Sequence, residues 1–325
     1  KQEISEVVAM KMHRLWKKIA VLLAALLLLP CFSATAFAYE AVDIGREASL
    51  TVYFGEEGMD FPGVEFRLYR VADVAETGDL ALTGDFAEYP VSLKDLDSSG
   101  WRALAQTLDA YAARDGLTPL KVIATDQSGQ AVFEQLSVGL YLITADCYER
   151  DGYIYTPEPF LICLPDEKNG QWEYDVASAC KFDSEYIPSD NNTVSRKVLK
   201  IWKDDGNEKK RPEQISVQLL RNGEVYDTVT LNDSNNWRYE WTDLDESFKW
   251  QVTEYKTPEN YTVSVSREGI TYVMTNTYQS EKPGTPETPG KSGTPGNTRL
   301  PQTGMLWWPV PLLAFAGLLL FLIGW

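Results

Sequence analysis

The chain has 325 residues, with 30 Lys and Arg against 47 Asp and Glu, so its net charge at pH 7 is −17. This acidity excludes a nucleic-acid partner, because counterion release on binding requires clustered basic side chains. The single histidine, His13, lies in the leader segment described next. The rest of the chain therefore lacks histidine for nucleophile activation, acid/base work or metal ligation. We predict no turnover enzyme, no cofactor and no metal site.

The first apolar segment has the three parts of a secretory signal peptide. Basic residues precede an apolar run of about eleven residues, and the small-residue stretch SATAFA ends at Ala38. The run is too short for a spanning helix. We predict a signal peptide over residues 1–38, cleaved between Ala38 and Tyr39. A lipoprotein signal at Cys31 is the disfavoured alternative, because Pro30 occupies a position where a small residue is expected.

Residues 40–186 show the alternation of apolar and polar residues that is typical of half-buried strands. GVEFRLYRV, GLYLITADC, PFLICLP and WEYDVAS are the clearest examples. One helix is expected at DSSGWRALAQTLDAYAARDG, with a cap at Asp97 or Ser98 and Gly116 as its stop. Its predicted apolar face comprises Trp101, Leu104, Leu108 and Tyr111. These features predict one all-β domain with a helical insert.

Residues 194–279 predict a second, smaller all-β domain. The strands ISVQLL and VYDTVTL flank the turn RNGE, and WRYEW, FKWQVTE, YTVSVS and TYVMTNTY follow. Short strands with turn signals about every ten residues favour a β-sandwich. The segment DSEYIPSDNN between the two domains is the predicted linker. The predicted fold class is therefore all-β, as tandem β-sandwiches.

The last part of the chain combines a spacer, a short motif and an apolar run. Residues 280–299 are rich in Pro, Gly and Thr, which predicts a semi-rigid spacer with nothing to bury. The uncharged run from Met305 to Trp325 extends roughly 32 Å as a helix, which is enough to span a bilayer. Between spacer and run lies LPQTG, formed by Leu300, Pro301, Gln302, Thr303 and Gly304.

LPQTG before an apolar run resembles the LPxTG sorting signal of Gram-positive wall-anchored proteins. The resemblance implies that a sortase cleaves between Thr303 and Gly304 and joins the Thr303 carbonyl to an amine of peptidoglycan or of another subunit. It also implies transient membrane anchoring through residues 300–325. Family signals end in a basic tail that is absent after Trp325, and the chain starts at Lys1 rather than Met. Both features leave its completeness at either end open.

Residues 194–279 resemble the Cna B-type domain, an Ig-like sandwich, over nearly all their length. VLKIWKDDGN, KRPEQISVQLLRNG, NNWRYEWTDL, WQVTEYKTPENYTV and TNTY occur in family order. Many such domains form an internal isopeptide bond between a first-strand lysine and a last-strand asparagine, helped by an acidic residue. The resemblance points to Lys200 and Asn276 as the joined residues and to Glu254 as the proton relay.

Strand parity supports this assignment independently. Lys200 shares a strand face with Val198 and Trp202, and the other two polar residues also share faces with apolar neighbours. Lys197 and Lys203 have the opposite parity and fit less well. Burial favours the neutral forms of an amine and a carboxyl group, so the lysine could attack the carboxamide and expel ammonia. A surface Lys, Glu and Asn on three strands is the alternative.

The cross-link would have a mechanical purpose. It would join the first and last strands of the domain, so that tension bypasses the 75 residues between them. By analogy with disulfide loop closure, it would stabilise the fold by about 4.5 kcal/mol.

Residues 40–186 resemble, more loosely, the amino-terminal domain of SpaA-type pilins, mainly in GVEFRLYRVAD, VGLYLI and PFLICLP. The ending WEYDVASACK follows the pilin motif WxxxVxVYPK and matches Trp172, Val176 and Lys181, although SAC replaces its V, Y and P. The resemblance implies that Lys181 attacks the sortase-bound threonine of the next subunit. A solvated lysine beside two core residues is the alternative. ASLTVYF lacks Lys and the last strand lacks Asn, so no second isopeptide bond is expected.

Three cysteines follow the leader: Cys147, Cys163 and Cys180. An oxidising exterior permits one disulfide, and we prefer Cys147 with Cys163 because the residues between them could form a hairpin. Buried free thiols are the alternative. The acidic loop KDDGNE lacks the spaced ligands of an EF-hand and predicts a solvated turn.

These observations predict a secreted structural protein of the Gram-positive cell wall, a pilin or pilus-like stalk subunit. Its partners would be a sortase and peptidoglycan or other pilin subunits. A monomeric adhesin, whose first domain binds a host protein or glycan, is the alternative. Lys181 discriminates between the two, because polymerisation needs this lysine and adhesion does not.

Overall fold

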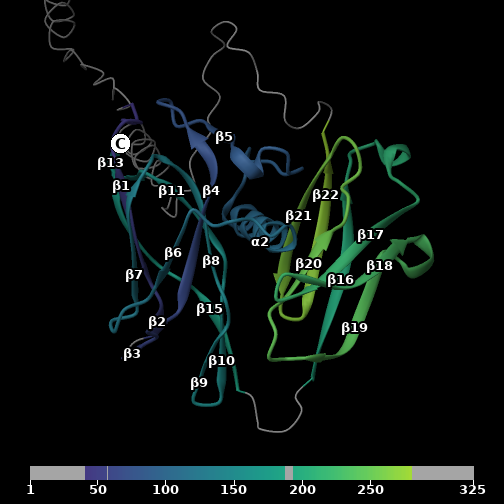
Figure 1. Cartoon of the computed structure of the whole chain (residues 1–325). Coiled ribbons are helices and arrows are strands. Elements are labelled where there is room, and N and C mark those ends of the chain that lie inside the picture. Colours follow the sequence, from purple (N-terminus) through teal and green to yellow (C-terminus); the bar gives the residue numbers. More distant parts are fainter. Residues whose placement is uncertain (1–40, 57, 187–192, 280–325) are drawn as a thin grey trace, which may run out of the picture. The chain divides into compact units, whose positions relative to one another are not determined.

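The structure is a computed structural model that describes residues 41–56, 58–186 and 193–279. Its strands form two sets that share no sheet (Figure 1). We call residues 41–186 the N-terminal sandwich and residues 193–279 the C-terminal sandwich; both belong to one compact unit. The predicted all-β fold class with one helical insert is confirmed.

Two main sheets and three small pairings form the N-terminal sandwich. One sheet contains, in spatial order, β14 (Asp175–Ala179), β1 (Ala48–Tyr53) and β7 (Gln130–Leu136). The other contains β11 (Phe160–Leu164), β8 (Gly139–Ala145), β4 (Glu65–Val74) and β5 (Leu80–Leu82), with β6 (Lys121–Ala124) also paired to β4. The three small groups are separate sheets. One contains, in spatial order, β15 (Phe182–Tyr186), β10 (Tyr153–Pro157) and β9 (Tyr148–Arg150). The other two are the strand pairs β2 (Gly55–Glu56) with β3 (Met59–Asp60) and β12 (Asp166–Lys168) with β13 (Gln171–Glu173).

The alternation in the sequence accounts for the N-terminal core. Along β1, Leu50 and Val52 are fully buried while their neighbours are half-buried, as the two-residue period of a strand requires. All seven residues of β8 are buried, so this strand is covered on both faces. β1 also pairs in parallel with β14, which brings Leu50 opposite Val176. The first strand of this sandwich and a strand near its end therefore bring apolar side chains opposite one another.

One long helix, α2 (Ser98–Arg114), follows the short 3-10 turn η1 (Gly84–Phe86). The side chain of Asp97 caps it by accepting a hydrogen bond from Gly100 N, and Gly116 follows with a φ of 62°. The predicted apolar face is confirmed, since all four of its residues are buried. The helix is also buried outside that face, at Thr107 and Asp109, because both sandwiches contact it.

The C-terminal sandwich has two sheets. The larger contains, in spatial order, β19 (Arg238–Asp245), β16 (Thr193–Lys203), β22 (Thr271–Tyr278) and β21 (Tyr261–Glu268). The smaller contains β18 (Glu224–Asn232), β17 (Gln214–Arg221) and β20 (Trp250–Glu254). The 3-10 turns η2 (Glu208–Lys210) and η3 (Asp233–Asn235) lie in its loops. β16 and β22 are parallel neighbours, so the first and last strands of this sandwich lie side by side.

Several sequence predictions fall outside the described residues. They are the signal peptide at 1–38, the spacer at 280–299 and the sorting signal with its apolar run at 300–325. Within the described ranges, no helix has the length and apolar character needed to cross a membrane.

Candidate functional site

The three residues predicted for an isopeptide site meet inside the C-terminal sandwich. Lys200 Nζ lies 3.2 Å from Glu254 Oε1. Asn276 Nδ2 donates hydrogen bonds to Glu254 Oε1 at 3.1 Å and Oε2 at 3.0 Å. The residues are 4%, 1% and 0% exposed, in the order Lys200, Glu254 and Asn276. One buried carboxylate thus contacts both an amine and a carboxamide.

Strand register explains why these side chains converge. In the parallel pair of β16 and β22, Lys200 lies opposite Met274 and Trp202 lies opposite Asn276. Lys200 and Asn276 are therefore offset by two residues on neighbouring strands, on the same inward face. Glu254 comes from β20 in the facing sheet. The two residues of opposite parity lie outside the core: Lys197 pairs with Glu240 at the surface, and Lys203 is exposed.

Burial changes the chemistry of the amine. Desolvation lowers the pKa of Lys200 from 10.5 to about 8, although the neighbouring Glu254 charge opposes the shift. Trp202 contributes to the wall of the site, with its ring centroid 4.7 Å from Lys200 Nζ. A lysine in this setting gives up its proton far more readily than a solvated one. It can therefore supply the neutral amine that nucleophilic attack requires.

The carboxamide of Asn276 is only half satisfied. Its Nδ2 donates to Glu254, whereas its Oδ1 has no hydrogen-bond partner among the described residues, although Asn276 is fully buried. A buried acceptor left unpaired costs about 1–3 kcal/mol. Such unsatisfied groups are rare in folded proteins. Among the three residues Lys200, Glu254 and Asn276, the carbonyl that would be attacked is therefore the group left without a partner.

The pilin-motif residues divide between core and surface. Trp172 on β13 packs partly buried against the core, and Val176 on β14 is buried. Lys181 is exposed in the junction between β14 and β15. Its backbone carbonyl accepts a hydrogen bond from Glu158 N at 2.7 Å. The backbone beneath an exposed lysine is therefore held in place, which suits an acceptor amine and also suits a simple surface residue.

The predicted disulfide is wrong for this structure, in which Cys147, Cys163 and Cys180 are all free thiols. Cys163 pairs with Leu140 near the start of β8, whereas Cys147 follows the end of that strand. The residues from 140 to 145 alone extend roughly 17 Å at about 3.4 Å each, well beyond the Cα separation of about 7 Å that a disulfide tolerates. Burial raises the pKa of Cys163 and of Cys180 to about 12.

The acidic loop KDDGNE is less solvated than predicted. Asp204 is buried and forms an ion pair with Arg211. It also accepts a hydrogen bond from the Tyr261 hydroxyl at 3.3 Å. These contacts make Asp204 a structural residue of the loop. Among the described residues, no group of three or more His, Cys, Asp or Glu side chains has a metal-binding arrangement.

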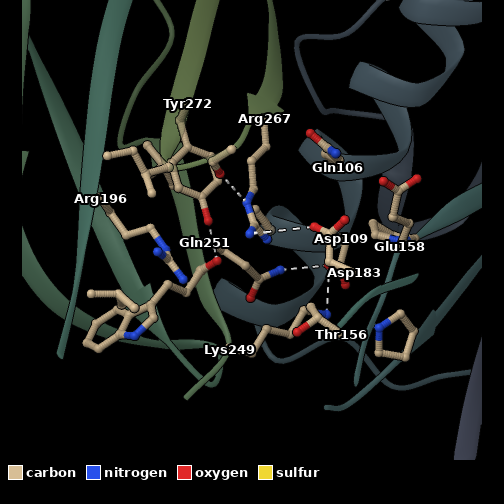
Figure 2. Close-up of a pocket in the computed structure, with 18 of the residues that line it drawn as sticks. Gln106, Asp109, Thr156, Glu158, Asp183, Arg196, Lys249, Gln251, Arg267 and Tyr272 are labelled. Atoms are coloured by element: carbon tan, nitrogen blue, oxygen red, sulfur yellow. Dashed lines mark hydrogen bonds and ion pairs between the residues drawn. The ribbon is translucent and has the colours of Figure 1, made fainter. Parts of the chain in front are cut away.

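A cavity of about 660 Å³ lies beside α2, β20 and β21. Figure 2 shows Arg196 and Arg267 entering it from one side, with Gln106, Asp109 and Glu158 opposite. Three pairs neutralise most of the charges that line it: Lys249 with Asp109 at 2.9 Å, Arg102 with Glu158 at 2.8 Å, and Arg267 with Asp183 at 3.7 Å.

Arg196 also lines this cavity and belongs to none of these three pairs. It is 7% exposed, its Nη1 donates to the adjacent Ser195 carbonyl, and its Nε has no partner among the described residues. Burial lowers its pKa. Sequence reasoning missed Arg196 and the Lys249 to Asp109 pair. Arg196 shares the strand parity of Val198 and Lys200, a signal that could have placed it inward. Lys249 precedes β20, and Asp109 lies outside the predicted apolar face of α2, so no local pattern indicated that another element covers this pair.

The family comparison places one match on the C-terminal sandwich. Residues 196–277 match the family model of the Cna protein B-type domain. A stretch of 111 residues is 36% identical to the collagen adhesin of Staphylococcus aureus, and it covers 32% of this chain. The chain spans only 9% of the length of that relative.

Similar solved structures include a single B repeat unit of the collagen-binding surface protein of Staphylococcus aureus, with 19% identity and a TM-score of 0.26 over 72% of this chain and 98% of that chain. The full-length major pilin SpaD from Corynebacterium diphtheriae has 17% identity and a TM-score of 0.29, over 73% of this chain and 65% of that chain. The Cna B-type resemblance predicted for residues 194–279 is thus confirmed by the family match over residues 196–277.

Proposed function

We propose that this protein is a wall-anchored structural subunit, a pilin or pilus-like stalk protein, with an isopeptide bond between Lys200 and Asn276. The observation that carries the proposal is the buried Glu254 carboxylate in contact with both reacting groups. The Cna B-type match and the similarity to a collagen adhesin support a role at the surface of a Gram-positive cell. The LPQTG motif and its flanking segments support attachment by a sortase.

The cross-link forms once per chain and is not turnover catalysis. Glu254 first takes a proton from the Lys200 ammonium, and the freed Nζ attacks the Asn276 Cγ. Protonated Glu254 then donates to the carboxamide oxygen, the atom that has no partner in the resting site. The C–N bond to Nδ2 then breaks as this nitrogen takes the proton back from the carboxamide oxygen and one of the two protons of the attacking Nζ, so that it leaves as an ammonium ion. Overall, an ammonium group and a carboxamide become an amide and an ammonium ion, and Glu254 recovers its starting state.

The position of the bond suits a stalk. Force would enter the C-terminal sandwich at the start of β16 and leave at the end of β22, which are parallel neighbours. Pulling on parallel strands from opposite ends shears them apart, and only hydrogen bonds and packing resist. A covalent link from Lys200 to Asn276 would carry the load directly. The domain would then transmit tension without unfolding.

Assembly of subunits would use a second lysine. We propose Thr303 as the donor that a sortase activates and Lys181 as the acceptor on the next subunit. The exposure of Lys181 and the anchoring of Trp172 and Val176 in the core support this role.

Wall extracts test the assembly. Wild-type cells should give a detergent-resistant ladder of high mass, and Lys181→Arg should abolish it while folded monomer remains, because a guanidinium stays protonated. Lys168→Arg, at an exposed lysine of the same sandwich, is the matched control and should keep the ladder. Thr303→Ala should move the protein from the wall fraction to the membrane or the medium. A ladder that survives in Lys181→Arg would exclude this lysine as the acceptor.

A monomeric adhesin is the second candidate. The cavity beside α2, with the buried and incompletely paired Arg196, is the observation that favours it. This candidate predicts that the cells show no ladder but bind a host protein or glycan. Loss of that binding in Arg196→Gln would support the adhesin function.

A further inference from the structure

The C-terminal sandwich has an open side between two strand edges. β20 is the last strand of the smaller sheet, and β21 is the last strand of the larger one. Edge strands normally expose a row of unpaired backbone groups. Here all five residues of β20 are buried, as are the first three of β21. The covering element is α2 of the N-terminal sandwich, which contacts both strands and lies beside them in Figure 1.

The N-terminal sandwich supplies hydrogen bonds that a neighbouring strand would otherwise provide. Val265 N donates to Thr107 Oγ1 on α2 at 2.8 Å. Two residues earlier on the same edge, Val263 N donates to the Pro90 carbonyl, also at 2.8 Å. The two-residue spacing is that of the outward-pointing amides of a strand. α2 and the loop before it thus cap the edge of β21.

A second set of contacts fixes β20, the strand that carries Glu254. Asp109 on α2 accepts a hydrogen bond from Gln251 Nε2 at 2.8 Å and pairs with Lys249 Nζ at 2.9 Å. Arg114 Nη1, at the end of α2, donates to the backbone carbonyl of Glu254 at 3.3 Å. α2 therefore touches the proton-relay residue itself, through its main chain.

Tyr111 closes the remaining space at this edge. It is 2% exposed, and its hydroxyl lies 3.4 Å from Thr257 Oγ1, just beyond the end of β20. The ring therefore fills the gap between α2 and the strand end where Glu254 lies. Removing it would open a path for water toward the buried Lys200 and Asn276.

We propose that α2 of the N-terminal sandwich is a positioning element for the Lys200 to Asn276 cross-link, which forms efficiently only when the helix has docked on β20 and β21. Arg114 and Tyr111 are its positioning residues: they hold the Glu254 backbone and exclude water without touching the reacting atoms. This inference rests on the proposed cross-link. It makes covalent locking of one sandwich conditional on the folding of the other, so a chain is locked only after both have formed.

The experiment follows ammonia loss in newly synthesised full-length chain by intact mass, over a series of pH values. In wild type, the rate should fall above a midpoint near pH 8, where Lys200 loses to solvent the proton that Glu254 would otherwise pass to the carboxamide oxygen. In Tyr111→Ala/Arg114→Ala, water entry should move the midpoint upward by at least one pH unit and slow the reaction at pH 7 at least tenfold. A purely structural role would lower stability without moving the midpoint.

Three further variants keep the test decisive. Arg102→Ala removes an arginine of α2 that pairs with Glu158 of its own sandwich, and it should react like wild type. The conservative pair Tyr111→Phe/Arg114→Lys should restore most of the rate. Thr107→Val, which deletes the acceptor of Val265 N with little change in volume, should also slow the reaction and replaces the double alanine variant if that variant does not fold.

Two outcomes separate this inference from the proposed function. If the wild-type chain never loses ammonia, the cross-link does not form, and both the proposed cross-link and the positioning role are excluded. If wild type does react, the positioning role can still fail by itself. It is overturned if both the double alanine variant and Thr107→Val react at the wild-type rate and with the wild-type pH midpoint.

Discussion

Two lysines in the described part of the chain, the buried Lys200 and the half-buried Lys249, contact carboxylates, yet their chemistry differs. At Lys200, burial outweighs the attraction of Glu254, and the pKa falls to about 8. At Lys249, burial also lowers the pKa, but Asp109 and other nearby acidic groups outweigh it, and the net pKa is raised. Lys249 is therefore a permanent ammonium group in an ion pair, whereas Lys200 can become a nucleophile. A buried lysine beside an acid is not by itself a reactive site.

The lowered pKa of Lys200 predicts a pH-dependent stability once the cross-link is blocked. In Asn276→Ala, the folded pKa stays below the unfolded value of 10.5, so the unfolded chain binds more protons between about pH 8 and 10.5. The free energy of unfolding should therefore rise with pH across that window, by a few kcal/mol at most. Denaturant titrations at pH 7.5, 9 and 10.5 measure it.

A double variant isolates the contribution of this lysine. Asn276→Ala with Lys200→Met lacks the titrating amine and should lose that rise, while every other ionisable group stays the same. If the free energy of unfolding rises equally with pH in the single and the double variant, Lys200 is not the group with the lowered pKa.

The buried thiols should be inert for the same physical reason. Because burial raises the pKa of Cys163 and Cys180 to about 12, the thiolate fraction at pH 8 is very small. Iodoacetamide should label the native protein at no more than the half-buried Cys147 and the denatured protein at all three. Fast native labelling of Cys163 or Cys180 would show that their surroundings open readily.

Among the elements, β16 and β22 are the pair on which the mechanical proposal depends. Stretching a single molecule of wild type should leave the 75 residues between Lys200 and Asn276 locked. In Glu254→Gln, which keeps the shape of the relay but cannot cycle its proton, the same pull should release roughly 250 Å of additional chain. Glu240→Gln, at the surface pair with Lys197, should behave like wild type. Equal contour lengths in all three would contradict a load-bearing cross-link.

The sequence predicted those elements well where burial follows from the apolar pattern of a single strand or helix. The two-residue period of β16, β20 and β22 placed Lys200, Glu254 and Asn276 inward, and the cap and apolar face of α2 were also correct. It failed where a second element decides burial. Thr107 and Asp109 lie outside the predicted apolar face of α2, and they are buried because the helix also contacts the C-terminal sandwich. The pairing of Cys147 with Cys163 failed because strand register, which spacing does not reveal, separates them.

At the scale of the whole molecule, the two sandwiches share one pairing but differ in its chemistry. In both, the first strand pairs in parallel with a strand from the end of the domain, β1 with β14 and β16 with β22. The inward positions hold Leu50, Val52 and Val176 in the N-terminal sandwich, where Lys200 and Asn276 lie in the other. Apolar packing thus holds one domain, and a proposed covalent bond locks the second.

The intact mass of the purified wild-type chain tests the central claim most directly. The account predicts a mass lower than the sequence mass by one ammonia, and a proteolytic fragment in which Lys200 is joined to Asn276. Glu254→Gln should fold, keep its full mass and melt several degrees or more below wild type, as a loss of a few kcal/mol in a domain of this size requires. A folded wild-type chain with its full, unreduced mass would contradict the account and leave Lys200, Glu254 and Asn276 as a buried polar cluster without covalent chemistry.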